Sequence, residues 1–383
     1  MADAALEIVR QTGRRPSGGI VIGPGDRGSP GAPLSYRQGD HPEPGPGSFA
    51  AAEALAAVVD QIPSDAEVWV LLSGGTTSLI GAPEPGLTSQ DLSAIYRLLL
   101  GSGLEITAMN LIRKRFSRWG GGKLARALAP ATVQVYIVSD VIGDDLASIG
   151  SGPCVPDRTT ATEIRHLLER SGLWERIPLS ARGLVGAAEA GSIPETPKPG
   201  DAAFAHVTSE VIASNRLALE AACSRARALG LDAMVIGEPI AGEAAETGAR
   251  IAAELVEDCG HRRNPSSRRC TVWGGETTVT LSSGSNGLGG RCQELALAAA
   301  EVLHSSRSDV TLLAAGTDGR DGPTDAAGAI VDRNTWKAIT VAGKDPAREL
   351  AAHNAYHALD AAGGLLRPGL TGTNVMDVVI GIC

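Results

Sequence analysis

The sequence predicts an α/β fold in which a mostly parallel sheet is covered by helices on both faces. Short apolar runs alternate with Ala-rich stretches of helical period along the 383 residues. The runs are continuously apolar, which is typical of parallel strands buried on both faces. Several runs end in Gly-rich or acidic loops, and α/β sheets bind their ligands beyond the carboxyl ends of their strands. These loops are therefore expected to line one cleft.

The expected strands are short, rich in Val, Ile or Leu, and bounded by Gly, Pro or polar residues. In chain order they are Gly19–Ile22, Val68–Leu72, Val133–Val138, Val207–Ala213, Ala233–Ile236, Thr271–Trp273, Thr277–Leu281, Val310–Ala314, Ala329–Val331 and Val378–Ile382.

The segments between the strands favour helices, because their apolar residues recur with a period of about 3.6. The first residues, MADAALEIVRQTG, also predict an amphipathic helix. Thr88 and Asp91 give one helix a capping-box start. The remaining expected helices are Phe49–Gln61, Ser89–Leu100, Gly122–Leu128, Thr160–Arg170, Arg216–Leu229, Glu243–Asp258 and Gly289–His304.

The chain is long enough for two domains, each with its own core. Residues 188–203, AEAGSIPETPKPGDAA, are rich in Pro, Gly and charge, and they predict the domain linker. The formal net charge is −9 and no long basic stripe exists, so nucleic acid is not an expected partner. The six cysteines lack a Cys-x-x-Cys pair, which predicts a reduced chain without zinc.

Targeting signals and membrane spans are not expected. The N-terminal residues contain no signal-peptide apolar region, and no run approaches the ~18 apolar residues of a membrane span. The predicted location is therefore the cytoplasm, with no membrane partner.

Residues 110–157 carry the strongest functional signal. A cationic cluster brackets three glycines, and a buried strand then ends in an acidic loop, Ser139–Asp145. Cations near glycines suit phosphate, while carboxylates at a strand end suit Mg²⁺ or a proton to be removed, which together indicate phosphoryl transfer. Asp140 is nearest the strand end and is expected to be a general base or to orient its neighbours. Asp144 is open to a simpler role as a helix cap. The cluster consists of Arg113, Lys114, Arg115, Arg118 and Lys123.

Two Gly-rich loops are candidate anion sites. The first follows a strand and offers backbone N–H groups and hydroxyls, although it lacks the Gly-Lys-Ser/Thr of a Walker A loop. The second opens a helix with Arg291 at its mouth. A tight turn and a surface arginine are the alternatives that stay open. The candidate phosphate-binding residues are Ser73, Gly74, Gly75, Thr76, Thr77, Gly289 and Gly290.

Acidic and amide side chains at other strand ends complete the candidate site. Asp318 and Asp321 lie in the acidic loop Gly316–Asp325 and are candidates for Mg²⁺ or a substrate hydroxyl, with a solvated turn as the alternative. Glu276 and Asn374 lie at strand–loop junctions and are candidates for substrate contact or for a structural role.

One motif points to a different chemistry. Residues 23–28, GPGDRG, match the G-x-G-x-x-G fingerprint of dinucleotide-binding proteins. The next residues are rich in Pro and Gly, which opposes the helix that this fingerprint requires. A chance match is the better interpretation.

Taken together, these segments resemble the type II glycerate kinases, which phosphorylate the 2-hydroxyl of D-glycerate and carry a C-terminal MOFRL domain. The matches run in order along nearly the whole chain. They include GDHPEP at 39–44, SGG at 73–75, IRK at 112–114, SDVIGDDL at 139–146, SGPCVPD at 151–157, GGET at 274–277, GGR at 289–291, GTDGRDGPTDAAGA at 316–329 and TGTNVMD at 371–377.

The resemblance implies two Rossmann-like three-layer domains, residues 1–200 and 206–383, with a cleft between them. It implies ATP and Mg²⁺ as cofactors, D-glycerate as substrate and 2-phosphoglycerate as product; a homodimer is left open. Arg291 matches the family's catalytic arginine, and Ser73–Thr77 match part of its phosphate-binding wall. Lys114 and Asp140 fall on further motif positions and are expected to be catalytic.

The chain also departs from the family pattern. Thr76, Arg115, Gly120 and Cys292 replace a Gly, a His, a Lys and an Asn. The family's first strand ends in Gly-Lys-Ala with a lysine thought to be catalytic, and residues 1–2 here match positions inside the following helix. A missing cation of this kind is expected to lower the rate by ~10²–10³. Two alternatives remain. An NAD(P)H-dependent hydroxypyruvate reductase rests on a name that members of the family often carry and on the GPGDRG match, and a ligand-binding remnant without activity rests on the missing lysine segment.

Overall fold

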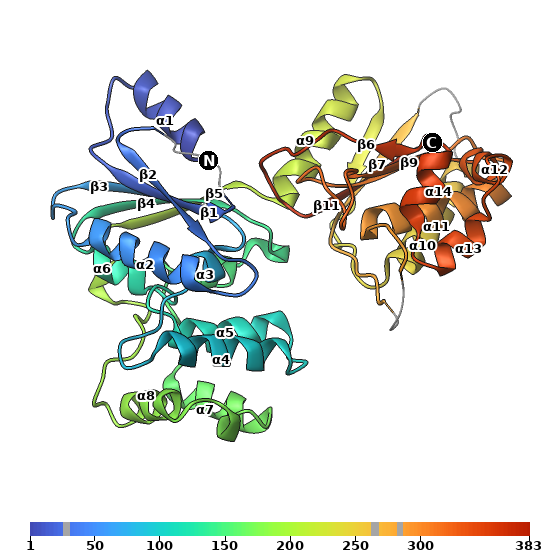
Figure 1. The fold of residues 1–383 in the computed structure, drawn as a ribbon. Coiled ribbons are helices and arrows are strands. Elements are labelled where there is room, and N and C mark those ends of the chain that lie inside the picture. Colours follow the sequence, from blue (N-terminus) through green and yellow to red (C-terminus); the bar gives the residue numbers. More distant parts are fainter. Residues whose placement is uncertain (26–30, 262–267, 282–285) are drawn as a thin grey trace. The chain divides into compact units, whose positions relative to one another are not determined.

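The computed structural model describes residues 1–25, 31–261, 268–281 and 286–383, which form two compact units (Figure 1). The first unit contains Met1–Ile137 and Asp144–Ile212, and the second contains Val138–Gly143 and Ala213–Cys383. The α/β class is confirmed, because helices and strands alternate through both units. No helix in the described ranges is long and apolar enough to cross a membrane.

The strands of the first unit form two small sheets within the described residues. Strand β1 (Gly19–Pro24) pairs in parallel with β2 (Leu34–Gly39). Strand β4 (Thr132–Val138) lies between β3 (Glu67–Leu72), to which it is parallel, and β5 (Val207–Ala213). Strand β4 is thus the middle strand of its sheet, and alternate residues along it are buried.

Helices cover these strands and then form a layer of their own. In Figure 1, α1 (Ala2–Gln11) lies on one side of the strands, while α2 (Pro46–Val59) and α6 (Lys123–Leu128) lie on the other. A separate apolar core joins further helices, with Tyr96 and Phe116 among its largest buried side chains. These helices are α4 (Ser89–Leu100), α5 (Ile106–Phe116), α7 (Ala161–Arg170) and α8 (Leu179–Glu189).

The sheet of the second unit has mixed strand directions, which corrects the expectation of a mostly parallel sheet there. Strand β11 is antiparallel to both of its neighbours, β7 and β8, and only the β6–β7 pairing in the described residues is parallel. An apolar run does not encode its own direction, so the sequence pattern could not reveal this. The order is β10 (Leu365–Leu366), β9 (Gly328–Asp332), β8 (Thr311–Gly316), β11 (Asp377–Ile382), β7 (Arg269–Gly275) and β6 (Asp232–Val235).

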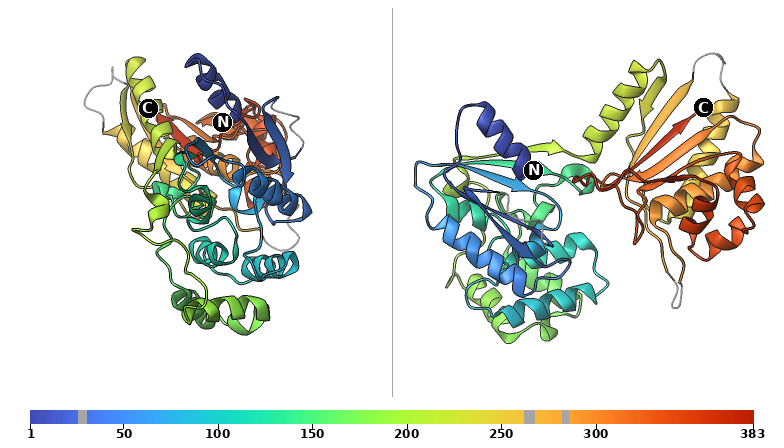
Figure 2. Two further views of the ribbon diagram at one scale, coloured as in Figure 1. Left: turned by 90° about the vertical axis from the view of Figure 1, so that its left-hand side faces the viewer. Right: turned by 45° about the horizontal axis from the view of Figure 1, so that its top comes forward.

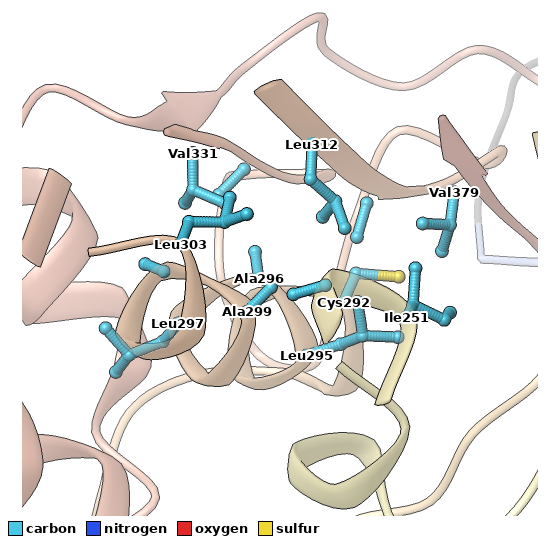
Figure 3. Packing of buried hydrophobic residues seen from close by; sticks show 14 of the residues in the cluster. Ile251, Cys292, Leu295, Ala296, Leu297, Ala299, Leu303, Leu312, Val331 and Val379 are labelled. Carbon is cyan, nitrogen blue, oxygen red and sulfur yellow. The ribbon is translucent and has the colours of Figure 1, made fainter. Parts of the chain in front are cut away.

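This sheet is covered on both faces, so the second unit has three layers (Figure 2). Helix α9 (Asn215–Ala228) packs on β6 and β7, and α10 (Ala244–Gly260) and α11 (Arg291–Ser305) pack on the other face. Buried alanines of α11, including Ala296 and Ala299, let the helix approach β8 and β9 closely (Figure 3). The remaining helices are α12 (Thr335–Val341), α13 (Pro346–Ala351) and α14 (Ala355–Ala361).

Several local expectations were wrong. The expected strand Thr277–Leu281 is not formed; Thr278 makes an isolated bridge to Glu243, and Thr280 is hydrogen-bonded to the same carboxylate. Residues 188–203 are not a linker between units, because they lie within the first unit. The cationic cluster lies largely on helix α5, which was missed because three buried charged residues interrupt its apolar pattern.

Candidate active site

The loop after β3 is a tight turn into α3 (Thr76–Leu79). Gly75 has φ 78°, a left-handed conformation that favours glycine, and a side chain there would lie 2.9 Å from the ring of His41. The Thr76 hydroxyl donates to the carbonyl oxygen of Ser73 at 2.7 Å. The predicted anion loop therefore has a shape that its own residues enforce, with Ser73 exposed at its tip.

A second loop lies against the first. Gly150, Ser151 and Gly152 have φ of 57°, 62° and 58°, so three successive residues adopt the left-handed conformation. The Ser151 hydroxyl is hydrogen-bonded to the hydroxyl of Thr77 at 2.9 Å, and the Ser151 carbonyl oxygen accepts from the amide of Gly121 at 2.8 Å. A non-glycine residue in this conformation is strained and is often found at functional sites.

Lys114 is a predicted cation close to this loop pair. It lies on α5 with 3% exposure, and a side chain added to Gly120 would lie near both Lys114 and Ser151. Burial lowers the pKa of Lys114, while the charges of Asp157 and Asp145 oppose this change. Its amino group donates no hydrogen bond to any residue that the structure describes. A buried ammonium group without hydrogen bonds is costly unless it meets an anion.

The neighbouring cations are already paired. Arg113 lies 4.9 Å from the ring of Tyr96, Arg115 is bonded to Glu195, and Lys123 is bonded to Glu84. Nε of Arg113 and Nε and Nη2 of Arg115 also lack a hydrogen-bond partner in the described residues, but both side chains have another partner. Of the buried basic residues on α5, Lys114 is therefore the one that forms no hydrogen bond, ion pair or ring contact with the described residues. The charge pattern of the sequence could not separate these roles.

Arg291, the first residue of α11, is the centre of a second group of charges. Its Nε and Nη2 donate to Asp377 at 2.6 and 3.0 Å, and its Nη1 lies 2.5 Å from Oε1 of Glu276. Burial lowers the pKa of Arg291, but its bonds to Asp377 and the nearby charges outweigh burial and raise the pKa. The guanidinium is therefore charged and held on two sides.

The two carboxylates that bind this arginine are themselves affected by burial and by neighbouring acids. Burial raises the pKa of Glu276, and the charges of Asp377 and Asp140 add to this effect. The charge of Asp318 likewise contributes to the raised pKa of Asp377, for which burial is the largest cause. Of the predicted acids, Glu276 thus pairs with Arg291, while Asp140 and Asp318, which belong to the same unit, act on the two carboxylates that bind it.

Asp321 and the glycines before Arg291 serve a structural purpose. The carboxylate oxygens of Asp321 accept the amides of Cys292 and Gln293 at 3.2 and 2.8 Å, so this side chain caps α11. Burial raises the pKa of Asp321 to about 6, despite these amides, which lower it. A side chain at Gly290 would lie 2.3 Å from the Asp321 carboxyl carbon. Close packing thus explains Gly290, and the two amides are not open to phosphate.

Two more predicted positions are explained locally. Gly289 lies against residues 353–355, and its carbonyl oxygen would touch a side chain placed at Gly322. Asn374 is exposed, and its Oδ1 accepts the amide of Met376 at 3.0 Å, which shapes the turn into β11. No hydrogen bond within the described ranges links Asn374 to Arg291.

The predicted site residues thus fall into two groups. The first unit holds Lys114 with the loop at 73–77, and the second holds Arg291 with the other candidates. Sequence reasoning missed Ser151 and Asp377, both of which lie inside motifs that it used. An acid directly before the expected strand Val378–Ile382 was the available signal for Asp377.

The candidate metal ligands do not form a closed cage. Within the described residues, no group of three or more His, Cys, Asp or Glu side chains could hold a metal ion. Magnesium bound to a nucleotide needs only one or two carboxylates, because phosphates and water supply the other ligands. Oδ1 of Asp318 accepts the amide of Arg320 at 2.9 Å, and its Oδ2 accepts no hydrogen bond from the described residues. Asp318 therefore suits such an ion.

Similarity to known proteins extends along the chain. The domain of unknown function DUF4147 matches residues 1–185, and the MOFRL family matches residues 269–377. A glycerate 2-kinase from Pyrococcus horikoshii is 39% identical over 343 residues, which are 89% of this chain and 76% of that protein. The crystal structure of a glycerate kinase from Thermotoga maritima matches with a TM-score of 0.89 and 35% identity, covering 100% of this chain and 88% of that one.

The chain belongs to the glycerate 2-kinase family. The resemblance drawn from the motifs is thereby confirmed. One relative from Agrobacterium vitis, 37% identical over 94% of this chain and 80% of that protein, carries a hydroxypyruvate reductase name.

The structure near the dinucleotide fingerprint agrees with the glycerate 2-kinase family rather than with that name. Residues 26–30, which include the end of the fingerprint, lie outside the described residues. The next described element after β1 is the strand β2 and not the helix that the fingerprint requires.

Proposed function

We propose that this chain is an enzyme that transfers the γ-phosphoryl group of ATP to the 2-hydroxyl of D-glycerate, giving 2-phosphoglycerate and ADP. The observation that carries the proposal is Lys114, a buried cation that makes no hydrogen bond to the described residues and lies near strained loops. The family relationship supplies the substrate, since relatives over most of this chain are named glycerate 2-kinase.

Lys114 and the loop at 73–77 are proposed to bind phosphate oxygens. Phosphoryl transfer spreads negative charge over these oxygens, and a fixed cation in a site shielded from water stabilises that charge strongly. The hydroxyl pair of Thr77 and Ser151 fixes the loop beside this position. The amino group is already desolvated in the free protein, so little reorganisation is needed when phosphate arrives.

Arg291 is proposed to stabilise the transferring group, and Asp140 to take the proton of the 2-hydroxyl. The hydroxyl oxygen forms the new bond to the γ-phosphorus while the bond to the ADP oxygen breaks. The acids around Arg291 keep it charged, which its raised pKa reflects. Asp140 is half-buried at the end of β4, in the unit that contains Arg291.

Asp318 is the proposed ligand of magnesium brought by the nucleotide. Magnesium supplies neutralisation of the β- and γ-phosphate charges. Asp321, the other candidate from the sequence, is not proposed as a ligand, because both of its carboxylate oxygens accept amides at the start of α11. We also propose a cytoplasmic location, since ATP and a small hydroxy acid are found there; a homodimer stays open.

An ADP-release assay with D-glycerate tests the proposal. The expected result is ADP formation that requires D-glycerate, ATP and Mg²⁺ together. Oxidation of NAD(P)H with hydroxypyruvate, in place of that turnover, would show the reductase instead. Binding of ATP by calorimetry without any turnover would point to a ligand-binding protein.

A further inference from the structure

The three donor nitrogens of Arg291 are divided between two very different carboxylates. Nε and Nη2 face Asp377 in a bidentate pair, and Nη1 faces Glu276. A bidentate pair fixes both the position and the plane of a guanidinium, whereas a single contact fixes neither. The two partners therefore hold this arginine with unequal strength.

Asp377 is anchored from every side. Its side chain is 2% exposed, and its backbone lies in the sheet between β7 and β8, opposite Gly275 and Gly316. The amide group of Asn215 donates to its carbonyl oxygen at 2.9 Å, and the thiol of Cys292 is hydrogen-bonded to its carboxylate.

Helix α11 is equally fixed at this end. Figure 3 shows Cys292, the residue after Arg291, pointing into the core beside Ile251 and Val379. The Arg291 backbone and the Asp377 carboxylate thus both belong to the rigid core. Neither is free to follow a ligand.

Glu276 differs from Asp377 in its exposure, its position and its contact with Arg291. Its side chain is 44% exposed, it lies beyond the end of β7, and its ion pair with Nη1 of Arg291 is not accompanied by a hydrogen bond in the described residues. Burial raises its pKa, and the negative charges of Asp377 and Asp140 repel the Glu276 carboxylate and raise its pKa further. A half-exposed carboxylate that is repelled by two neighbours is the partner that yields when another anion arrives.

We propose that Asp377 is a positioning residue that fixes the Arg291 guanidinium, and that Glu276 is an internal counter-ion that an anionic oxygen of the substrate displaces from Nη1. This inference rests on the proposed function, since it takes Arg291 as the group that meets the substrate. It reverses the sequence-based expectation for Glu276, which becomes a competitor of the substrate rather than a ligand for it.

Glu276→Gln tests the displacement. Glutamine keeps the shape and removes the competing charge, so the affinity for either D-glycerate or ATP should rise at least threefold. Steady-state KM and calorimetric titration with each ligand identify which anion meets Nη1. Weaker or unchanged affinity for both ligands would overturn the displacement.

Asp377→Asn tests the positioning role. Asparagine cannot form the bidentate ion pair, so kcat should fall at least tenfold while the KM values change less than threefold. Melting temperature is measured alongside, because a buried acid is lost. If Asp377→Asn does not fold, Asp377→Glu moves the carboxylate by one methylene and should give the same loss of kcat. A folded variant with kcat within twofold of the parent would overturn the role.

Asp258→Asn is the matched control. Asp258 and Asp232 contact Arg269 at 3.3 and 3.6 Å on the surface of the same unit, so this variant also removes one carboxylate from a doubly paired arginine. Its kinetics should equal those of the parent. If the parent shows no turnover, the proposed function fails, and calorimetry of Glu276→Gln with ATP and D-glycerate still decides the displacement by the same criteria.

Discussion

Single residues in this chain divide into charges with partners and charges without them, and burial decides how much this matters. Arg115 is buried and bonded to a carboxylate, and the partly buried Lys123 is bonded to another. Lys114 is as buried as Arg115 but bonds to none of the described residues. Removing a buried charge that has a partner destabilises a protein, because the partner is left unpaired. Removing a buried charge without a partner relieves a desolvation cost.

Lys114→Met should therefore separate activity from stability. We expect kcat to fall by ~10²–10³, because one fixed cation is lost from the transition state. The melting temperature should stay equal or rise, because methionine fills the site without a charge. Kinetics and thermal unfolding of the same preparation measure both. Lys344→Met, which breaks an ion pair with Glu349 on the second unit, is the control. Unchanged kcat in Lys114→Met would remove this residue from the site.

Arg291→Lys should show that geometry as well as charge is needed. Lysine keeps the positive charge, but it cannot face Asp377 and Glu276 with a planar fork of donors. We expect kcat to fall at least tenfold with little change in melting temperature. Full activity in this variant would mean that Arg291 acts as a point charge only.

Asp321 should make stability depend on pH. Its folded-state pKa of about 6 lies above the ordinary aspartate pKa of 3.8, so the folded protein binds this proton more tightly than the unfolded chain does. The resulting stability is present below about pH 4 and is lost as pH rises through 6.

Denaturant unfolding of the parent and Asp321→Asn measures this dependence. Between pH 4 and 7, the unfolding free energy of the parent should fall by up to about 3 kcal/mol relative to that of the variant. Asp345→Asn, which makes the same exchange at an exposed cap of α13, controls for the change of capping residue. A difference that is constant with pH would contradict the assignment.

At the scale of elements, local sequence signals for helix starts were reliable. Thr88 and Asp91 form the predicted capping box of α4, and Thr160 and Glu163 form another at α7. Both helices pack into the same apolar core of the first unit. The caps therefore stabilise the layer that carries α5 and Lys114.

Thr88→Ala should cost about 1 kcal/mol of unfolding free energy, because the amide of Asp91 loses its acceptor. Thr88→Ser keeps the hydroxyl and should cost far less. Urea unfolding of the three proteins measures the difference. An alanine variant as stable as the serine variant would show that the cap is not a significant contributor.

The sequence predicted most strands and several helices to within a few residues, because each has an apolar pattern of its own. It could not predict strand direction in the second unit, since β11 lies between β7 and β8 only after distant segments meet. It named Arg291 and Glu276 but not their pairing, and it treated Asp321 as a ligand although the carboxylate caps α11. These contacts depend on tertiary geometry that no local pattern contains.

At the scale of the whole molecule, each unit contributes one cationic centre, Lys114 in the first and Arg291 in the second. The match to the Thermotoga maritima glycerate kinase covers 100% of this chain, so both units have counterparts there. The net charge of −9 gives anionic ligands no general attraction to this chain, so local cations such as Lys114 and Arg291 must bind them.

The position of the phosphoryl group on the product tests the central claim most directly. The protein is incubated with D-glycerate, ATP and Mg²⁺, and the product is examined by phosphorus–proton correlation NMR. We predict 2-phosphoglycerate, with phosphorus coupled to the single proton on C2. Coupling to the two protons on C3, or no phosphorylated glycerate at all, would contradict the account.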